Sequence, residues 1–463
     1  MYTPHSLPRQ ADRSFPPHPR SQGLAFLLFL AGHAALAPAM RESSTIATIH
    51  AIATLLVGTW AAARWRLEDV MCVIAYITGA EVLWRMTGAD VFWEIGKYAI
   101  AVISIGAALR LGRFSRRQLL AILYVLLLVP SLVLVDGGNN LDQIRQQIAF
   151  NLSGPLALAA CAFLGSQTTL SPGHRRRLSG ALVGPVLAIA VISLLATLGM
   201  SSADFTTASN FRAAGGFGPN QVSSILGLAA LTAFLSLFDP GASSSFKALM
   251  LGVMILSAVQ SALTFSRGGL YCAMGAALLA SLYLLRSAGS RVRLLTLALV
   301  LGLTANRFLW PRLDAFTQGK LSGRFQSVSP TRRDALVRDD LRIWLEHPVR
   351  GVGPGELQAH RTVAAASAHS EFSRLLAEHG LLGIGALLSL LAMCRESIRR
   401  TRTATNRAQV VALFAWSFLY MSYTAMRTVA PSFVFGLACA QSSGDPVRRA
   451  PGSVRRQGAV SLS

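Results

Sequence analysis

Long apolar runs are the feature that most constrains how this chain can fold. Runs of roughly 17 to 25 residues, the length that crosses a bilayer as a helix, recur along most of the sequence. Inside lipid every backbone polar group must be hydrogen-bonded within its own segment, so helices are expected. Only 14% of the 463 residues are charged, against about a quarter in soluble chains. The sequence therefore predicts an all-α, polytopic helical membrane protein.

The apolar runs predict about 12–14 transmembrane helices. The expected spans are residues 23–40, 46–63, 70–87, 91–109, 118–135, 150–170, 180–200, 221–238, 247–265, 268–285, 292–309, 380–394, 408–425 and a short last one at 428–441. The first run can also be read as a signal peptide, because Ala35-Leu36-Ala37 resembles a cleavage site. We favour a retained span, because the preceding tail is long for a signal peptide.

Arginine-rich loops determine the expected orientation. Short loops rich in Lys and Arg stay in the cytoplasm, and here every second loop is basic while the loops between are nearly free of these residues. The basic loops contain Arg64 and Arg66; Arg110, Arg113, Arg116 and Arg117; Arg175 to Arg177; Lys247; Arg286, Arg291 and Arg293; and Arg395 to Arg407. Both termini are therefore predicted to be cytoplasmic. Because these loops explain much of the net charge of +22, we do not expect nucleic-acid binding.

A long polar insert interrupts the spans and is expected outside, where the chemistry should lie. The expected parts are a disordered basic cytoplasmic tail (1–22), a transmembrane bundle (23–309), a long outer loop that should carry the chemistry (310–379), C-terminal transmembrane helices (380–441) and a cytoplasmic basic tail (442–463). The insert concentrates cations and imidazoles: Arg312, Arg324, Arg332, Arg333, Arg338, Arg342, Arg350, Arg361, Arg374, His347, His360, His369 and His379.

One amphipathic helix of about four turns is predicted inside the insert. It begins near Thr331, which precedes Asp334 in a capping-box-like spacing. It ends at Pro348 and the glycine-rich turn 351–355. The predicted apolar face carries Val337, Leu341, Trp344 and Leu345.

Two readings apply to the arginines of this helix. Arg333 falls near its apolar side, where an arginine needs an anion. Arg338 and Arg342 flank that side and can equally be solvated, paired at i,i+4 with Asp334 and Glu346.

A second helix is predicted to begin near Ser367 or His369. Glu371, Arg374 and Glu378 share one side of it and are expected to pair. A lone histidine on an apolar face, such as His369, is more often a hydrogen-bonded core residue than a catalytic one. The residues alone leave both roles open.

Two further arginines lie on the expected outer side. Arg267 stands in Ser266-Arg267-Gly268-Gly269 between two spans, where it can snorkel to head groups or, beside the glycines, meet a ligand. Arg212 precedes a glycine-rich entry turn and can be structural. Glu81 and Arg85 are expected to form a structural i,i+4 pair.

Metal ligation is not expected. The insert histidines lack a spacing such as HExxH. The five cysteines stand singly, without a CxxC pattern, and suit small core positions: Cys72, Cys161, Cys272, Cys394 and Cys439.

Three motifs carry a family resemblance. They are Ser266-Arg267-Gly268-Gly269, the segment from Arg333 through His347-Pro348-Val349-Arg350-Gly351-Val352-Gly353, and His369-Ser370-x9-Gly380-x2-Gly383. Through them the chain resembles the O-antigen ligase and Wzy-type polymerase superfamily of bacterial envelope glycan transferases. The last motif matches the ligase pattern H[NSQ]-x9-G-x-x-G at every fixed position. The helix motif commonly has Trp four residues after its first Arg, where this chain has Val337. The resemblance covers about the second half of the chain.

The resemblance implies an inverting glycosyltransferase that needs neither metal nor cofactor. It would move a glycan from undecaprenyl pyrophosphate to an acceptor hydroxyl, such as one of lipid A-core, at the periplasmic face of the bacterial inner membrane. His369 is then the candidate general base. Arg267 and Arg333 are the candidate pyrophosphate clamp, with Arg338 and Arg212 as weaker contacts. The expected partners are the lipid-linked donor, the acceptor and membrane lipids.

Other functions stay open at this point. A Wzy-type polymerase of O-antigen or exopolysaccharide would use a lipid-linked acceptor, and a protein O-oligosaccharyltransferase would use Ser or Thr; the exact match to the ligase pattern favours a ligase. A polysaccharide flippase or transporter would also have many helices, but would be expected to show repeats, broken spans and midplane charges. This chain concentrates ionisable groups at one face, which favours an enzyme.

Overall fold

A computed structural model describes residues 19–110, 116–136, 140–327, 332–362 and 369–443. Nearly all of this part is helical, which confirms the predicted all-α class. The elements are α1 (Pro19–Glu42), α2 (Ser44–Arg64), α3 (Leu67–Met86), α4 (Ile95–Leu109), α5 (Arg116–Leu128), η1 (Pro130–Leu134), α6 (Leu141–Gln167), β1 (Thr169–Leu170), α7 (Pro172–Leu198), η2 (Ser202–Asp204), α8 (Pro219–Leu237), α9 (Ser244–Leu263), α10 (Arg267–Leu284), α11 (Ala288–Thr304), η3 (Ala305–Leu309), α12 (Trp310–Phe316), α13 (Lys320–Gln326), α14 (Arg332–Glu346), α15 (Leu357–His360), α16 (Glu371–Arg400), α17 (Ala404–Thr424), α18 (Ala430–Ala438) and β2 (Gln441–Ser442).

Each predicted span contains helical residues, and all but the last follow a helix over most of their length. Within the described ranges, nine helical stretches are long and apolar enough to cross a membrane: α1, α2, α5 with η1, α6, α7, α8, α9, α11 through α12, and α16. The helices α3, α10 and α17 belong to the same bundle, because α3 packs along α7 and α10 packs along both α8 and α17. The chain is therefore a polytopic helical membrane protein.

The last predicted span differs from the expectation. Where residues 428–441 were expected to cross, α18 has only nine residues, less than half the length that spans a bilayer. It packs against α6 and α17 instead. Beyond it, β2 pairs in parallel with β1, so the chain is tied back to the end of α6.

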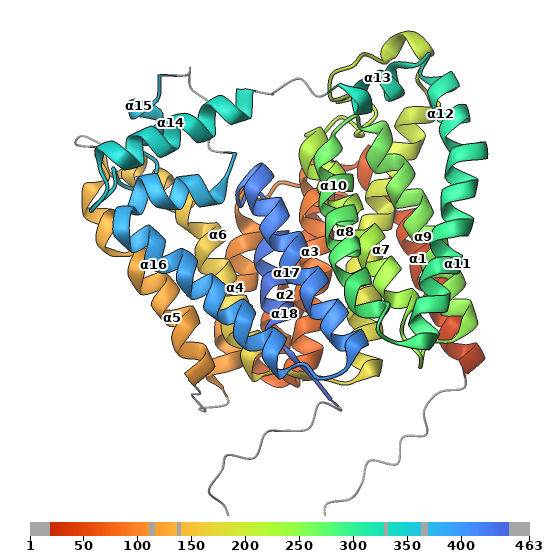
Figure 1. The fold of residues 1–463 in the computed structure, drawn as a ribbon, viewed down its shortest axis with the longest axis horizontal. Helices are drawn as coiled ribbons and strands as arrows, with labels where there is room; N and C mark the ends of the chain where they lie inside the picture. Colours follow the sequence, from red (N-terminus) through yellow and green to blue (C-terminus); the bar gives the residue numbers. More distant parts are fainter. Residues whose placement is uncertain (1–18, 111–115, 137–139, 328–331, 363–368, 444–463) are drawn as a thin grey trace, which may run out of the picture.

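The elements of the insert gather at one end of the bundle (Figure 1). There α14 and α15 lie near the start of α16, while α13 lies above the start of α10. The helix α14 has the four turns that were predicted and ends before Pro348. Thr331, its predicted cap, lies outside the described residues. The second predicted helix, α16, begins at Glu371 with Ser370 as its N-cap.

The predicted apolar face of α14 is wrong. The residues it buries are Leu336, Asp339, Asp340 and Ile343, whereas Leu341 and Leu345 are exposed. The two aspartates can be buried because segments elsewhere in the chain supply their partners. Asp340 pairs with Arg361 at 2.6 Å and accepts a hydrogen bond from Ser373 Oγ at 2.7 Å, and Asp339 accepts one from Thr362 N.

The orientation of the bundle can be tested with reporter fusions. The helix α16 runs from the end that carries α14 to the opposite end (Figure 1), and its 30 residues extend about 45 Å. A reporter fused after Arg361 is expected to read periplasmic and one fused after Arg402 cytoplasmic. The opposite pair of readings would contradict the orientation inferred from the basic loops.

Candidate active site

Tyr423, near the end of α17, joins three segments that are distant in sequence. Its hydroxyl group hydrogen-bonds Asn220 Oδ1 and Ser266 Oγ, each at 2.9 Å. The guanidinium of Arg333 lies over its ring, 4.2 Å from the ring centroid. The start of α10 and the start of α14 therefore both contact one aromatic residue.

The two glycines after Arg267 are needed for this arrangement. A Cβ atom on Gly268 would lie 1.9 Å from Cζ of Tyr423, and one on Gly269 would lie 2.0 Å from the carbonyl oxygen of Ser223. Only residues without a side chain allow α10 to approach α8 and α17 so closely. The Ser266–Gly269 motif thus places Arg267 between two residues that contact Tyr423, Ser266 and Gly268.

A third arginine joins Arg267 and Arg333. Arg324 of α13 donates from Nε to the carbonyl oxygen of Phe265 at 2.9 Å, and Arg267 donates to the carbonyl oxygen of Ser327. Burial, together with the charges of Arg267 and Arg333, lowers the pKa of Arg324. In the described part of the chain none of these three guanidiniums forms an ion pair with a carboxylate. We call Arg267, Arg324 and Arg333 the arginine cluster.

His369 lies at the edge of the arginine cluster. Its carbonyl oxygen accepts a hydrogen bond from Ala425 N at 2.9 Å, which ties it to the segment that follows Tyr423. Its ring atom Nδ1 is buried and has no hydrogen-bond partner among the described residues. Burial first, and then the charges of Arg427, Arg333 and Arg361, lower the pKa of His369 to about 4. At neutral pH the imidazole is therefore uncharged.

Arg427 is a cation that the sequence analysis missed. Burial and the nearby charge of Arg333 lower its pKa. Its backbone is held by the Glu81–Arg85 pair, which forms as predicted at 2.8 Å. Arg85 donates to the carbonyl oxygen of Arg427 at 3.1 Å, and Glu81 accepts from Val429 N at 2.7 Å. The structural pair of α3 thus positions a cation beside His369.

Gly380 of the last motif allows the turn after α14 to pack against α16. Gly380 has a φ of 57° and interrupts the helix. The turn after α14 hydrogen-bonds the backbone at this interruption: Val352 N donates to Ala377 O, Gly353 N to Glu378 O and Leu381 N to Val349 O, at 3.0 to 3.2 Å. A Cβ atom on Gly380 would lie 2.5 Å from the carbonyl oxygen of Val349. These contacts connect the motif that ends at Gly353 with the motif that contains Gly380.

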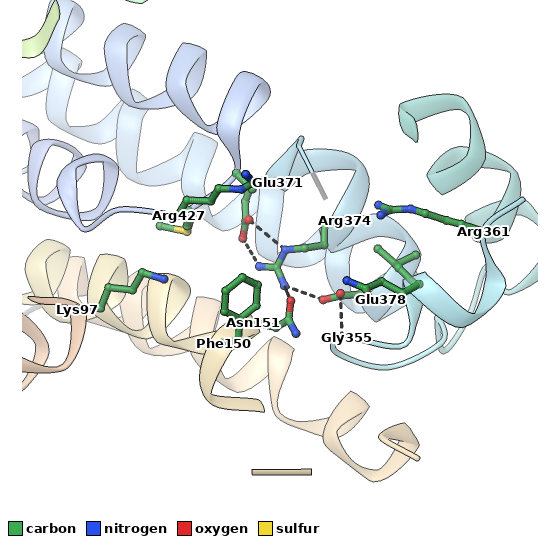
Figure 2. A pocket seen from close by; sticks show the side chains of 13 residues that line it. Lys97, Phe150, Asn151, Gly355, Arg361, Glu371, Arg374, Glu378 and Arg427 are labelled. Atoms are coloured by element: carbon green, nitrogen blue, oxygen red, sulfur yellow. Dashed lines mark hydrogen bonds and ion pairs between the residues drawn. The ribbon is translucent and has the colours of Figure 1, made fainter. Parts of the chain in front are cut away.

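The predicted pairing on the first turns of α16 is confirmed. Arg374 binds Glu371 through Nε at 3.1 Å and Glu378 through Nη1 at 2.7 Å, and Figure 2 shows its guanidinium between the two carboxylates. All three side chains are buried. On α14, the predicted Arg342–Glu346 pair forms at 3.2 Å, whereas no ion pair joins Asp334 and Arg338 in the described ranges.

The structure does not bring Arg212 and Arg338 into the arginine cluster. Arg212 is exposed and pairs with Asp204 at 3.0 Å, so its charge is already balanced. Arg338 is exposed on α14. Among the described residues, no group of three or more His, Cys, Asp or Glu side chains could hold a metal ion.

A sequence signal for Arg427 existed. Arg427 lies between two apolar runs on the expected outer side, where short loops are otherwise nearly free of arginine. The residues around Tyr423 and Asn220 do not indicate a functional role, because each residue simply lies at the end of a helix. Their role depends on contacts with α10 and α14.

Comparison with known proteins supports the resemblance seen in the motifs. Residues 252–388 match the family model described as O-Antigen ligase, a segment that contains the arginine cluster and His369. No curated protein and no solved structure gives a significant match to the chain. The chain is thus similar, over residues 252–388, to the O-antigen ligase and polymerase family of glycan-transferring membrane proteins.

Proposed function

We propose that this protein transfers a glycan from undecaprenyl pyrophosphate to an acceptor hydroxyl at the periplasmic face of the bacterial inner membrane, with lipid A-core as the acceptor. The observation that carries the proposal is the arginine cluster beside an uncharged histidine. Three guanidiniums that pair with no carboxylate among the described residues suit a diphosphate, because guanidinium binds phosphate oxygens in a bidentate manner.

The proposed reaction is a single inverting displacement. The acceptor oxygen attacks the anomeric carbon of the donor sugar, and the bond from that carbon to the pyrophosphate oxygen breaks. The electron pair of that bond leaves with the pyrophosphate, whose growing charge is stabilised by the arginine cluster. The proton of the acceptor hydroxyl passes to His369. Because the guanidiniums supply the positive charge, the proposed reaction needs no metal ion.

The Nδ1 atom of His369, which has no hydrogen-bond partner in the described part of the chain, fits the role of a base. A neutral imidazole accepts a proton only at the nitrogen that carries no hydrogen, and a histidine buried for structural reasons would normally have its nitrogens satisfied. Here burial, and then the surrounding guanidiniums, keep the ring neutral before the donor binds. Binding of the negatively charged donor then makes the ring a stronger base.

Transfer by the purified protein tests the proposal. In nanodiscs containing EDTA, the protein is expected to move glycan from the undecaprenyl pyrophosphate donor to lipid A-core extracted from a strain that lacks the glycan. The products, separated by size, should carry the full donor glycan on lipid A-core. Lengthened glycan on the lipid carrier would identify a polymerase instead. Activity that required a divalent ion would contradict the proposed role of the arginine cluster.

The pH dependence of transfer provides a second check. In the free protein the pKa of His369 is lowered to about 4, so kcat/KM is expected to fall only as the pH drops toward this value. Bound pyrophosphate stabilises the imidazolium and raises the pKa, so the acidic limb of kcat should lie at higher pH. Initial rates from about pH 3 to about pH 8 measure both limbs. If the acidic limbs of kcat/KM and kcat fell at the same pH, the pKa of the titrating group would not depend on the bound donor.

A further inference from the structure

The ion pair of Glu81 and Arg85, near the end of α3, is buried and contacts other segments of the chain. The side chain of Arg85 is 6% exposed and that of Glu81 is 1% exposed. A buried ion pair adds little to stability, because the removal of both charges from water offsets their mutual attraction. Such a pair does hold the groups that it contacts in a fixed geometry. Its role therefore depends on which groups these are.

Arg85 connects α3 with three segments that are distant in sequence. From Nη1 it donates to Gln221 Oε1 at 3.0 Å and to the carbonyl oxygen of Arg427 at 3.1 Å. From Nη2 it donates to Glu81 Oε1 and to the carbonyl oxygen of Trp93, each at 2.8 Å. Its guanidinium also lies over the ring of Trp93, 4.4 Å from the centroid. Because the donors of a guanidinium point in fixed directions, the four acceptors are held in one arrangement.

Gln221 connects this ion pair to the arginine cluster. Its neighbour Asn220 accepts hydrogen bonds at Oδ1 from Ser266 Oγ at 2.8 Å and from the hydroxyl group of Tyr423 at 2.9 Å. Ser266 directly precedes Arg267 in the sequence. Because Gln221 and Asn220 share the first turn of α8, a shift of Gln221 would displace the hydrogen bonds that hold the start of α10.

Arg427 connects the same ion pair to His369. Besides the bond from Arg85 to the carbonyl oxygen of Arg427, Glu81 accepts a hydrogen bond from Val429 N at 2.7 Å. The backbone is thus tied to α3 at Arg427 and again two residues later. After burial, the charge of Arg427 is the largest cause of the lowered pKa of His369. The other charged groups that lower this pKa are Arg333 of α14 and Arg361, which follows α15.

We propose that Arg85 is a positioning residue for glycan transfer, which fixes Arg427 beside His369 and the start of α8 against the arginine cluster. The inference rests on the proposed function. It extends the site beyond residues 252–388, the segment that matches the family model, since α3 precedes that segment and Arg427 follows it.

The variant Arg85→Lys tests this role. Lysine keeps the charge that pairs with Glu81, so the protein should fold, but it lacks the planar fork that holds the four acceptors. We expect kcat/KM to fall roughly tenfold, because small misplacements of reacting groups slow catalysis. The acidic limb of kcat/KM should also move to higher pH by roughly half to one unit, because a displaced Arg427 lowers the pKa of His369 less. Transfer rates in nanodiscs from about pH 3 to about pH 8 measure both effects.

Two further variants separate the contacts of Arg85. Gln221→Leu keeps the ion pair and the bond to Arg427, so it should lower kcat/KM but leave the acidic limb in place. Arg176→Lys is the matched control, because it changes a different partly buried ion pair, with Asp239 at 3.1 Å. It should behave like the wild type.

Thermal unfolding distinguishes positioning from a merely structural role. If Arg85→Lys lowered only the Tm and the amount of protein, and the folded protein kept the kcat/KM and acidic limb of the wild type, the inference would be overturned. If Arg85→Lys failed to fold, Glu81→Gln would decide, because it keeps the shape of the side chain and weakens its hold on Arg85. Its acidic limb should also move to higher pH, and an unmoved limb would overturn the inference.

Binding of undecaprenyl pyrophosphate without acceptor separates this inference from the proposed function. The wild type and Arg176→Lys should bind it equally, and Arg85→Lys about tenfold more weakly, in line with the loss of kcat/KM. If the wild type bound this lipid but transferred no glycan to lipid A-core, the proposed function would fail, while weaker binding by Arg85→Lys would still support the positioning role. Equal binding by all three proteins would overturn that role.

Discussion

His369→Gln is expected to lower the rate of glycan transfer by roughly 10²- to 10⁴-fold, the usual contribution of a general base, while the protein accumulates normally in the membrane. Glutamine has a similar length but cannot take up a proton at neutral pH. Among the described residues, His369 makes one hydrogen bond, through its backbone carbonyl, and the substitution leaves that bond in place. Transfer assays at equal protein level in nanodiscs measure the effect.

The matched control is His360→Gln, which should retain nearly full activity because His360 is exposed. His379 is unsuitable as a control, although it lies outside the fixed positions of the motif. It is fully buried and its Nδ1 hydrogen-bonds Ser131 Oγ, so His379→Ala would leave a cavity and remove a buried hydrogen bond. Near-normal transfer by His369→Gln would remove this histidine from the mechanism and leave only the arginine cluster.

Arg333→Lys is expected to lower kcat/KM on the order of 10- to 100-fold, equivalent to losing one hydrogen bond between charged groups. Lysine keeps the positive charge but loses the planar fork that binds phosphate at two points. It also stacks less well on an aromatic ring, so the contact with Tyr423 weakens. The effect should appear with the lipid-linked donor and leave the KM for the acceptor unchanged.

Arg338→Lys on the same helix is the control for this change. Arg338 is exposed and carries the same charge five residues further along α14, so a general loss of positive charge would affect both variants equally. We expect Arg338→Lys to stay within about twofold of the wild type, as exposed charges contribute little. Equal losses of kcat/KM in the two variants would show that Arg333 acts through the overall electrostatic field of the insert and not through contact with the donor.

The sequence by itself determined the features that depend on neighbouring residues. Apolar runs located the spans, because a helix in lipid must satisfy its own backbone and bury apolar side chains. The pairs Glu81–Arg85, Arg342–Glu346 and Arg374 with its two glutamates were predictable, since residues three or four apart share a helix face. The motif around Gly380 and Gly383 indicated the family.

Only the tertiary structure decided which of the candidate residues lie close together. The buried face of α14 was mispredicted because Asp339 and Asp340 find partners in Thr362, Arg361 and Ser373, and burial of a carboxylate depends on partners that periodicity does not reveal.

Partners that are distant in sequence also determine which residues make up the arginine cluster and its surroundings. Tyr423 joins Ser266 and Arg333 from two other segments, and the Glu81–Arg85 pair of α3 fixes the backbone of Arg427. Contacts between segments separated by many residues arise from helix packing, which in this bundle depends on close approaches at glycine such as Gly268 against Tyr423. The sequence could therefore name candidate cations, but only the packing selected Arg267 and Arg333, added Arg324 and Arg427, and left Arg212 and Arg338 outside.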